Sequence, residues 1–312
     1  MGIFEFGIKK KVEGIIFEAE LTALRSGVDR IEVLKAYARE IKSERLREEI
    51  TKIVRKLEKG ERYSKVYEPY LSPDVVKLIE IAESKGLPIA KMIEEYVPVK
   101  KTVENLESSL KAGLKVPLVT FALVSLVFSF VLSQFKQISQ SLELSFYSTF
   151  LMDYYAWVML VIGVVFGVVL WKYPNKVPFF KKVYDELKAI IGLSLSKTAY
   201  QMGLSSADLV PMLKSYYQAQ GKYSLDISGV IKLLYPYLSE LDKAQILIAV
   251  KYGKIEEKLS ELANEKFKNV ENLRKVINDG VDNLTKVLIA IPIFPPLVVY
   301  LDILSKVTSN IK

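Results

Sequence analysis

The feature that most limits the fold of this chain is a set of long uncharged stretches. Residues 116–135 form a run of twenty residues without a charge, bounded by Lys115 and Lys136. At about 1.5 Å per residue, a helix of this length extends about 30 Å, which is the thickness of a bilayer core. We therefore predict a transmembrane helix over 116–135.

Two further stretches are predicted to span the membrane. Residues 154–171 are uncharged, and aromatic residues lie at both ends, as at the two interfaces of a bilayer: Tyr154, Tyr155, Trp157, Trp171 and Tyr173. Residues 287–301 are shorter and contain Pro292, Pro295 and Pro296. On length alone this stretch could be a buried core segment. We nevertheless predict a third span, over 287–304.

Basic residues close to the spans indicate their orientation, because positively charged flanks stay in the cytoplasm. The segments before the first span, after the second and before the third are rich in lysine and arginine, whereas the stretch between the first two spans holds only Lys136. Residues 1–115 and 172–286 are therefore predicted to be cytoplasmic. The loop 136–153 and the tail 305–312 are predicted to lie on the other side.

The chain contains no histidine and no cysteine. It therefore cannot form a Ser-His or Cys-His nucleophile pair, a thiolate or imidazole zinc site, or a disulfide. The sequence also lacks a GxxxxGK[ST] phosphate-binding loop. Carboxylate–magnesium chemistry and Ser–Lys pairs survive as possibilities, but the polar residues within the spans, such as Thr120, Ser125 and Ser129, have no lysine or acid beside them. A membrane enzyme is therefore disfavoured, and we predict no catalytic residues, no cofactor and no metal. Any nucleotide-driven work must come from a partner.

The net charge of +8 could indicate nucleic-acid binding. However, lysine and arginine alternate with glutamate through both cytoplasmic regions, and the positive flanks of the spans account for much of the excess. A solvated helix surface is favoured, and no nucleic-acid partner is expected. The lipid bilayer is an expected partner.

The chain repeats itself at an offset of 167 residues. The segment Pro69-Tyr70-Leu71-Ser72 is identical to Pro236-Tyr237-Leu238-Ser239, and Gly86 aligns with Gly253. At an offset of 176, Gly27 aligns with Gly203. Each copy runs directly into a span. We infer a duplication of a soluble domain plus a membrane helix, in which 154–171 returns the chain so that both copies lie on one side.

Each cytoplasmic copy is predicted to be helical, because its apolar residues recur every three or four positions. Helix signals are frequent: Asp29 with Glu32, and Ser239 with Asp242, have the spacing of capping boxes, and Ser72 precedes a proline at a first helical position. Gly27, Gly60 and Gly86 are expected where helices end. We predict an all-α fold with two bundles of about six helices each and three transmembrane helices.

This arrangement resembles a known family. A helical domain, a span, a return span, a second helical domain and a span, together with Arg25-Ser26-Gly27-Val28 and Ile81-Ala82-Glu83-Ser84-Lys85-Gly86-Leu87, look like the type II secretion system F-domain proteins. Those are the inner-membrane platform proteins of type II secretion and type IV pilus machines. The family's Gly-Glu-x-Ser-Gly pattern is changed here, since Ala82 replaces the first Gly and Lys85 the Ser. In the second copy Val250 occupies the Glu position.

The resemblance implies a non-enzymatic scaffold in the bacterial inner membrane. It implies a cytoplasmic assembly ATPase, a pilin or pseudopilin, other inner-membrane assembly proteins and further copies of the chain as partners. It singles out residues Glu83, Ser84, Lys85, Gly86 and Leu87 as a candidate partner interface. The residues of the repeat motif, which are Pro69, Tyr70, Leu71, Ser72, Pro236, Tyr237, Leu238, Ser239 and Gly253, are assigned a structural role.

Three alternatives remain open at this stage. A carboxylate in the last turn of a helix opposes the helix dipole, so a compensating contact of Glu83 is expected. The alternative is that Glu83 is solvated or pairs locally with Lys85. The tyrosines near the repeat motif could form a partner surface, although core packing is favoured. The prolines of the third span could mark the broken helix of a small membrane transporter. We favour a break tolerated because a neighbouring helix binds the freed carbonyls.

Overall fold

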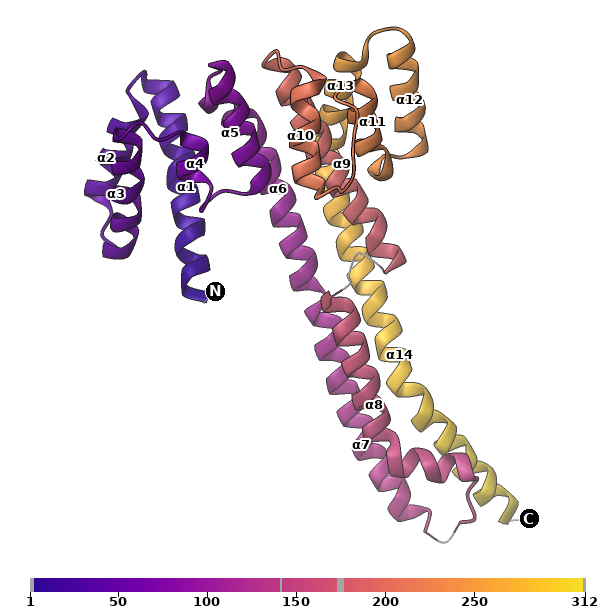
Figure 1. Ribbon diagram of the computed structural model, residues 1–312. Coiled ribbons are helices and arrows are strands. Elements are labelled where there is room, and N and C mark those ends of the chain that lie inside the picture. The colour runs from indigo at the N-terminus through magenta and orange to yellow at the C-terminus, as the bar shows by residue number, and fades with distance from the viewer. Residues whose placement is uncertain (1–2, 141, 173–176, 311–312) are drawn as a thin grey trace. The chain divides into compact units, whose positions relative to one another are not determined.

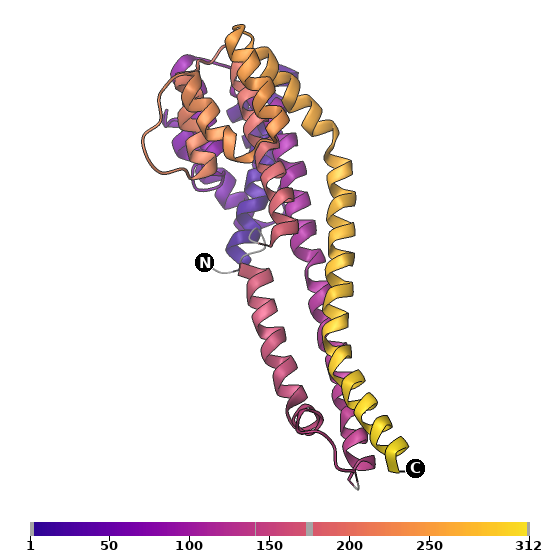
Figure 2. The same cartoon turned by 90° about the vertical axis from the view of Figure 1, so that its right-hand side faces the viewer.

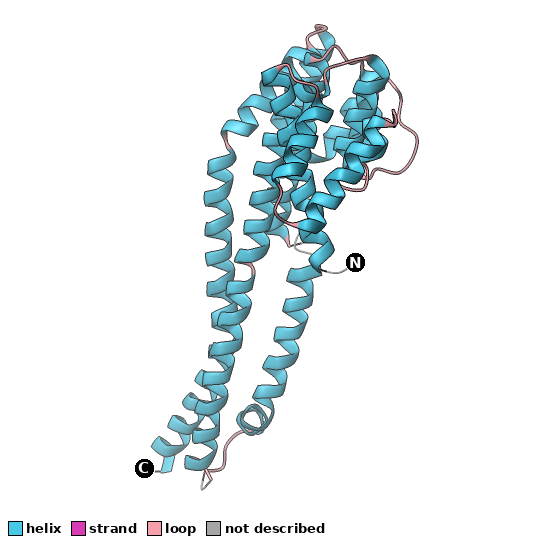
Figure 3. Cartoon of the chain, turned by 90° about the vertical axis from the view of Figure 1, so that its left-hand side faces the viewer, coloured by secondary structure: helices cyan, strands magenta, loops and turns pink. Residues whose placement is uncertain are grey.

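The computed structural model describes residues 3–140, 142–172 and 177–310. Over these residues the chain is helical and contains no strand, so the predicted all-α fold is confirmed (Figure 3). Several residues named in the predictions lie outside this description: residue 141 of the predicted loop, residues 173–176 of the second cytoplasmic region, which include the predicted membrane-interface residue Tyr173, and residues 311–312 of the tail. The side chain of Trp171 also lies outside it.

The chain forms two compact units. Unit 1 contains residues 1–103 and 185–268, and unit 2 contains residues 104–184 and 269–312. Most of both predicted cytoplasmic regions therefore falls in unit 1, and all three predicted spans fall in unit 2. The two units are described separately below.

The first half of unit 1 comprises α1 (Ile3–Ser26), α2 (Arg30–Glu40), α3 (Glu44–Glu58), α4 (Tyr63–Tyr67), α5 (Pro73–Lys85) and the part of α6 (Ile89–Gly113) up to residue 103. The predicted glycine stops are confirmed, because Gly27, Gly60 and Gly86 follow helices with φ values of 70°, 78° and 66°. A residue with a side chain would be strained in this left-handed conformation.

The caps of this half are confirmed only in part. Asp29 caps α2 by accepting the backbone N–H of Ile31 at 2.8 Å. In a capping box the Glu32 carboxylate would accept the backbone N–H of Asp29. Here Glu32 pairs instead with Lys35 at 2.7 Å. Pro73 occupies the first turn of α5 as predicted, but the Ser72 side chain makes no capping bond.

The second half of unit 1 comprises α9 (Pro178–Gln201), α10 (Ser206–Tyr217), α11 (Ile227–Leu234), a short 3₁₀ helix η2 (Tyr235–Tyr237), α12 (Glu240–Lys251) and α13 (Ile255–Lys268). The predicted capping box of Ser239 and Asp242 is confirmed, and Ser205 with Asp208 forms another at the start of α10. Helix α10 packs against α5, so the two halves contact each other within one unit (Figure 1).

Unit 2 is built from three long helices that contact one another: α7 (Lys115–Ile138), α8 (Phe146–Lys172) and α14 (Val270–Asn310) (Figures 1 and 2). All three predicted spans lie within helices that are long and apolar enough to cross a membrane. Large apolar side chains on each helix are exposed, including Leu126, Trp157 and Phe294. An apolar surface of this extent matches a lipid environment.

The helices extend beyond the predicted spans. Helix α8 begins eight residues before 154, so much of the predicted loop 136–153 is helical. At the start of α8, Asp302 of α14 accepts the backbone N–H of Ser145 at 3.0 Å and its hydroxyl at 2.8 Å. The aspartate that ends the third apolar stretch therefore holds the beginning of α8.

Helix α14 continues through its three prolines. Pro296 has no N–H, so it leaves the carbonyl of Pro292 without its usual partner four residues on. The buried Tyr155 of α8 donates its hydroxyl to that carbonyl at 2.7 Å. The interpretation that a neighbouring helix satisfies a freed carbonyl is confirmed at this position.

We predict that Tyr155→Phe destabilises the helix pair α8 and α14 by about 0.5–1.5 kcal/mol, because it leaves a carbonyl in the apolar unit without a donor. Thermal unfolding of the purified chain in detergent, followed by circular dichroism, measures the change. The matched control is Tyr154→Phe, since Tyr154 is half exposed. Equal melting of both variants and the parent would contradict this role for Tyr155.

Candidate partner-binding surface

Glu83 lies in the last turn of α5, and its carboxylate binds the beginning of α4. It accepts the backbone N–H groups of Tyr63 at 2.5 Å and Ser64 at 3.0 Å, and also the Ser64 hydroxyl. Arg62, the residue before α4, makes no capping bond of its own. Glu83 therefore caps a neighbouring helix, and the positive end of that helix compensates its unfavourable place at the end of α5.

Lys85 does not pair with Glu83. Its ammonium contacts the carboxylate of Asp208, on α10, at 2.6 Å. Burial raises the pKa of Asp208, but the hydrogen bonds from Lys85 and Ser205 outweigh it, so this pKa lies below its ordinary value. Because Lys85 is 42% exposed, the pair adds little stability to the contact of α5 with α10.

The other predicted interface residues line a groove at the surface. Glu83, Ser84, Gly86 and Leu87 border a hollow of about 590 Å³ between α5, α4 and the loop before α4. The left-handed Gly86 turns the chain there, and the N–H of Leu87 returns to the carbonyl of Ala82 at 2.8 Å. The structure thus brings four of the five predicted residues together and directs the fifth, Lys85, to α10.

A charged cluster that the sequence analysis missed lies beside this groove. The carboxylate of Glu20 is buried, accepts the hydroxyl of Tyr67 at 3.0 Å and lies 3.4 Å from the guanidinium of Arg30. Burial raises the pKa of Glu20, and the opposing effects of Arg30 and Tyr67 do not cancel it. Arg30 also lies 4.4 Å from the ring centre of Tyr63.

Glu20 and its partners had only a weak signal in the sequence. Glu20 lies four residues after the buried Ile16, on the apolar stripe of α1, where a charge is unusual. That position could have indicated a buried acid, but not its partners on α2 and α4. Arg30 and Arg62 both line the groove, next to apolar residues such as Leu57 and Ile89. The lining of the groove is therefore apolar in part and charged in part, with Glu61 and Glu83 beside the two arginines.

Residues of the repeat motif contact residues of other helices. The hydroxyl of Tyr70 donates to Glu49 at 2.5 Å, and Leu71 is buried. In the second half, Tyr237 stacks on Tyr217 with ring centres 4.5 Å apart, and Leu238 is buried. Tyr67 is also fully buried, so core packing of the tyrosines is confirmed at that position.

Each half also contains a buried lysine that joins its last two helices. In the first half, Lys100 of α6 contacts Asp74 of α5 at 2.6 Å and the hydroxyl of Ser72. Asp74 also accepts the hydroxyl of Tyr96 at 2.6 Å. Burial raises the pKa of Asp74, but the opposite effects of Lys100 and Tyr96 are larger together, so this pKa lies below its ordinary value.

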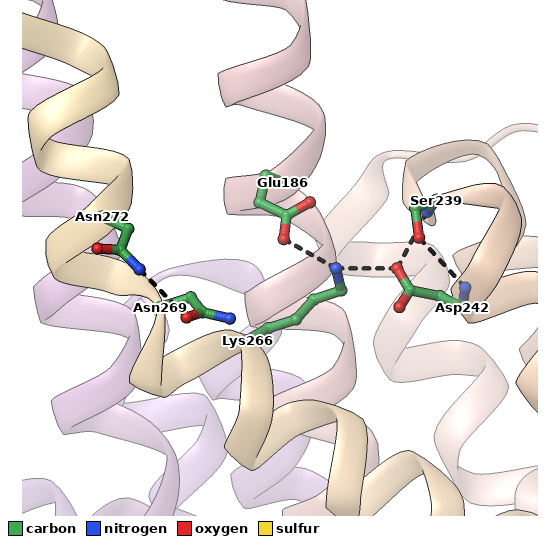
Figure 4. Close-up of polar contacts among 6 residues, drawn as sticks. All are labelled: Glu186, Ser239, Asp242, Lys266, Asn269 and Asn272. Carbon is green, nitrogen blue, oxygen red and sulfur yellow. Dashed lines mark hydrogen bonds and ion pairs between the residues drawn. The ribbon is translucent and has the colours of Figure 1, made fainter.

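In the second half, Lys266 of α13 lies between two carboxylates (Figure 4). It contacts Asp242 of α12 and Glu186 of α9, each at 2.8 Å. Burial lowers the pKa of Lys266, but its bonds to Asp242 and Glu186 raise it above its ordinary value. A lysine–aspartate pair therefore occurs at nearly the same place in both halves. Adding 167 to the number of Asp74 or of Lys100 gives a position one residue away from Asp242 or Lys266, respectively.

The two halves differ at the position of Glu83. Gly253 follows α12 with φ 68°, and the N–H of Lys254 bonds to Ala249 at 2.8 Å, as Leu87 does to Ala82. Val250 nevertheless replaces Glu83. Helix α11 needs no carboxylate from α12, because its own Asp226 accepts the N–H groups of Ser228 and Gly229. The two halves thus differ in how the helix before the repeat motif is capped.

We predict that Lys266→Met destabilises the chain by about 3 kcal/mol, because it leaves two carboxylates close together and partly buried. The control is Lys243→Met, whose partner Glu240 is 90% exposed, so that its loss costs less than about 1 kcal/mol. Urea unfolding in detergent, followed by circular dichroism, measures both. Adding Asp242→Asn to Lys266→Met should restore part of the loss.

The same pair gives a pH dependence with a defined sign. Burial raises the pKa of Asp242, but Lys266 and Ser239 lower it below its ordinary value of 3.8. The stabilisation is therefore complete above pH 3.8 and is lost as the pH falls through the lower pKa of the folded chain. This acid loss should be weaker in Lys266→Met. An identical acid profile and an unchanged urea midpoint would contradict the role assigned to Lys266.

Comparison with known proteins finds a family that is similar to part of the chain. Residues 21–135 match the model of the family described as type II secretion system (T2SS), protein F. No curated protein and no solved structure matches the chain. The matched segment runs from α1 to the end of the first predicted span, and it includes the groove and the Lys100 pair. The resemblance inferred from the sequence is confirmed over this segment.

Proposed function

We propose that this chain, which matches the type II secretion system protein F family over residues 21–135, is a non-enzymatic platform protein for type II secretion or type IV pilus assembly. It would link a cytoplasmic assembly ATPase to pilin or pseudopilin subunits in the membrane. The observation that carries this proposal is the family match, which covers most of the first helical bundle, from the end of α1 onward, and the predicted span that follows it.

The three apolar helices make the chain a membrane protein, and we propose that it lies in the bacterial inner membrane. In the proposed topology the bundles 1–115 and 172–286 are cytoplasmic, whereas the loop 136–153 and the tail 305–312 are not. The contact of α5 with α10 supports the placement of both bundles on one side, because bundles on opposite sides of a bilayer could not touch. The recurring lysine–aspartate pair and the matching turns at Gly86 and Gly253 support a duplication.

The alternative of a small transporter relied on the prolines of the third span. Such transporters use unwound backbone at mid-membrane to bind a substrate or ion. Here α14 remains helical through Pro292, Pro295 and Pro296, and Tyr155 binds the carbonyl of Pro292. These observations favour the platform over the transporter.

We propose that the groove bordered by Ser84, Gly86 and Leu87 contacts the assembly machinery. Glu83 is a poor probe of this role, because any change there also removes the cap of α4. Ser84 is exposed and Leu87 partly exposed, so substitutions there alter the surface with less effect on folding.

The test is secretion or pilus assembly in cells that carry Ser84→Arg or Leu87→Glu as the only copy of the gene. We expect loss of assembly and of co-purification with the ATPase, at normal membrane level and normal melting temperature. The matched control is Lys254→Glu, which changes the position equivalent to Leu87 in the second half. Full assembly in both groove variants would overturn the interface, and full assembly after deletion of the whole gene would overturn the platform function.

A further inference from the structure

A pocket with two lysines lies in unit 2, where the first predicted span begins and the second ends. It has a volume of about 260 Å³ and is lined by Lys111, Leu114, Lys115, Leu118 and Leu170. Leu114 and Leu170 are each only 3% exposed, whereas both lysines are exposed. In the proposed topology this end of the spans faces the cytoplasm. The pocket therefore has apolar walls and two positive charges beside the cytoplasmic leaflet.

No acid balances these two lysines within the described part of the chain. Lys111 and Lys115 are four residues apart, at the junction of α6 and α7. Glu107 is the nearest acid before them and does not line the pocket, and the next acid along the chain is Glu143. Neither lysine forms an ion pair with a residue that the structure describes. Both ammonium groups can therefore bind an anion from outside the chain.

The position of the spans does not by itself require this lysine pair. At the 167-residue offset, Asn278 and Asp282 occupy the positions of Lys111 and Lys115, shortly before the third span. There Lys286 supplies the positive charge next to the membrane instead. The preference for positive charges on the cytoplasmic side thus accounts for a lysine near each span. It does not account for two lysines beside one pocket.

An apolar groove continues from this pocket between α7 and α8. It has a volume of about 580 Å³, and Leu118 lines both hollows. The groove extends from Leu118 to Ser129 on α7 and from Ala156 to Gly167 on α8, and the two helices run in opposite directions (Figures 1 and 2). At about 1.5 Å per residue, each stretch is about 16 Å long. This length is about half of the 30 Å core of a bilayer, which is one leaflet.

The two hollows together match the charge and the length of one phospholipid. Basic pockets between membrane helices on the cytoplasmic side bind anionic lipid headgroups. We propose that the pocket at Lys111 and Lys115, together with the groove between α7 and α8, binds one anionic phospholipid. Its phosphate contacts the two lysines, and one acyl chain lies in the groove. The site depends on the proposed topology for its place in the cytoplasmic leaflet but not on the proposed platform function.

Two glycines of α8 shape the groove in different ways. A Cβ atom on Gly163 would lie 3.0 Å from the ring of Phe121, so Gly163 permits close packing of α8 on α7. A Cβ atom on Gly167, one turn later, would meet no atom within 4 Å. Gly167 therefore leaves open the space that the acyl chain fills. A larger side chain at position 167 would occupy the groove without displacing the described structure around it.

A transmembrane helix of another protein is the other candidate occupant. The hydroxyl of Ser125 is buried in the wall of the groove and bonds to no described residue, and a polar group on such a helix would satisfy it. However, a helix that spans the membrane is about 30 Å long, which is about twice the length of this groove. An apolar helix also offers no anion to Lys111 and Lys115. The geometry and the charge therefore favour a phospholipid.

Native mass spectrometry of the full chain in detergent tests the proposal. The chain is mixed with anionic phosphatidylglycerol or with zwitterionic phosphatidylcholine that has the same acyl chains. We expect one molecule of phosphatidylglycerol to bind in preference to phosphatidylcholine. Lys111→Gln together with Lys115→Gln should weaken this binding about 30-fold, the loss expected for two lysines near a membrane surface. The matched control is Lys275→Gln together with Lys286→Gln, which removes two exposed lysines outside the pocket and should bind like the parent.

A second variant distinguishes a phospholipid from a free anion. Gly167→Leu keeps both lysines but fills the groove, so it should reduce phosphatidylglycerol binding to the level of phosphatidylcholine while the melting temperature stays at or above that of the parent. Excess inorganic phosphate should not compete with the lipid. Unchanged lipid binding in Gly167→Leu, competition by phosphate, or equal binding of the two lipids by the parent would each overturn the proposal.

The occupant of the groove can also be identified in membranes. Leu126 lines the groove and is 69% exposed, so a photo-reactive side chain at this position reports what lies there. We expect cross-links to phospholipid, and fewer of them when Lys111→Gln and Lys115→Gln are also present. A cross-link to another protein in place of lipid would overturn the proposal and assign the groove to a partner helix.

Discussion

Lipid offers no hydrogen-bond partners to a backbone, and this constraint determines how the chain is built. Helices α7 and α8 meet it with their own backbone bonds, whereas α14 needs the hydroxyl of Tyr155 where Pro296 leaves a carbonyl free. In the topology that we propose, α7 and α8 carry the chain across the membrane and back. Only after this return can the two cytoplasmic halves contact each other through α5 and α10.

Signals that depend on neighbours in the sequence predicted the fold well. The uncharged runs, the glycine stops and the Ser239 capping box all appear where expected, because each depends on residues a few positions apart. The role of Glu83 could not be derived in this way. Its partners lie about twenty residues earlier, at the start of α4, and no local pattern identifies a carboxylate that caps another helix. For the same reason the sequence did not show that Lys85 binds α10.

Comparison of the two halves shows where they agree and where they differ. Both halves join their last two helices by a buried lysine and an aspartate, and both turn at a left-handed glycine. They differ in how one helix is capped. Glu83 of α5 caps α4, whereas Asp226 caps α11 and Val250 stands at the position of the glutamate. They also differ in the exposure of the helix after the repeat motif, since Ile81 of α5 is 9% exposed and Ile248 of α12 is 58% exposed.

The central claim is that both halves lie on one side of the membrane, joined by a return span. Single cysteines at exposed positions test it directly, since the chain has none of its own. Lys59→Cys lies in the first half, Gln220→Cys in the second and Glu143→Cys between α7 and α8. In spheroplasts, a membrane-impermeant maleimide should label only Glu143→Cys, and the other two should react after permeabilisation. Labelling of Lys59→Cys and Gln220→Cys from opposite sides would contradict the account.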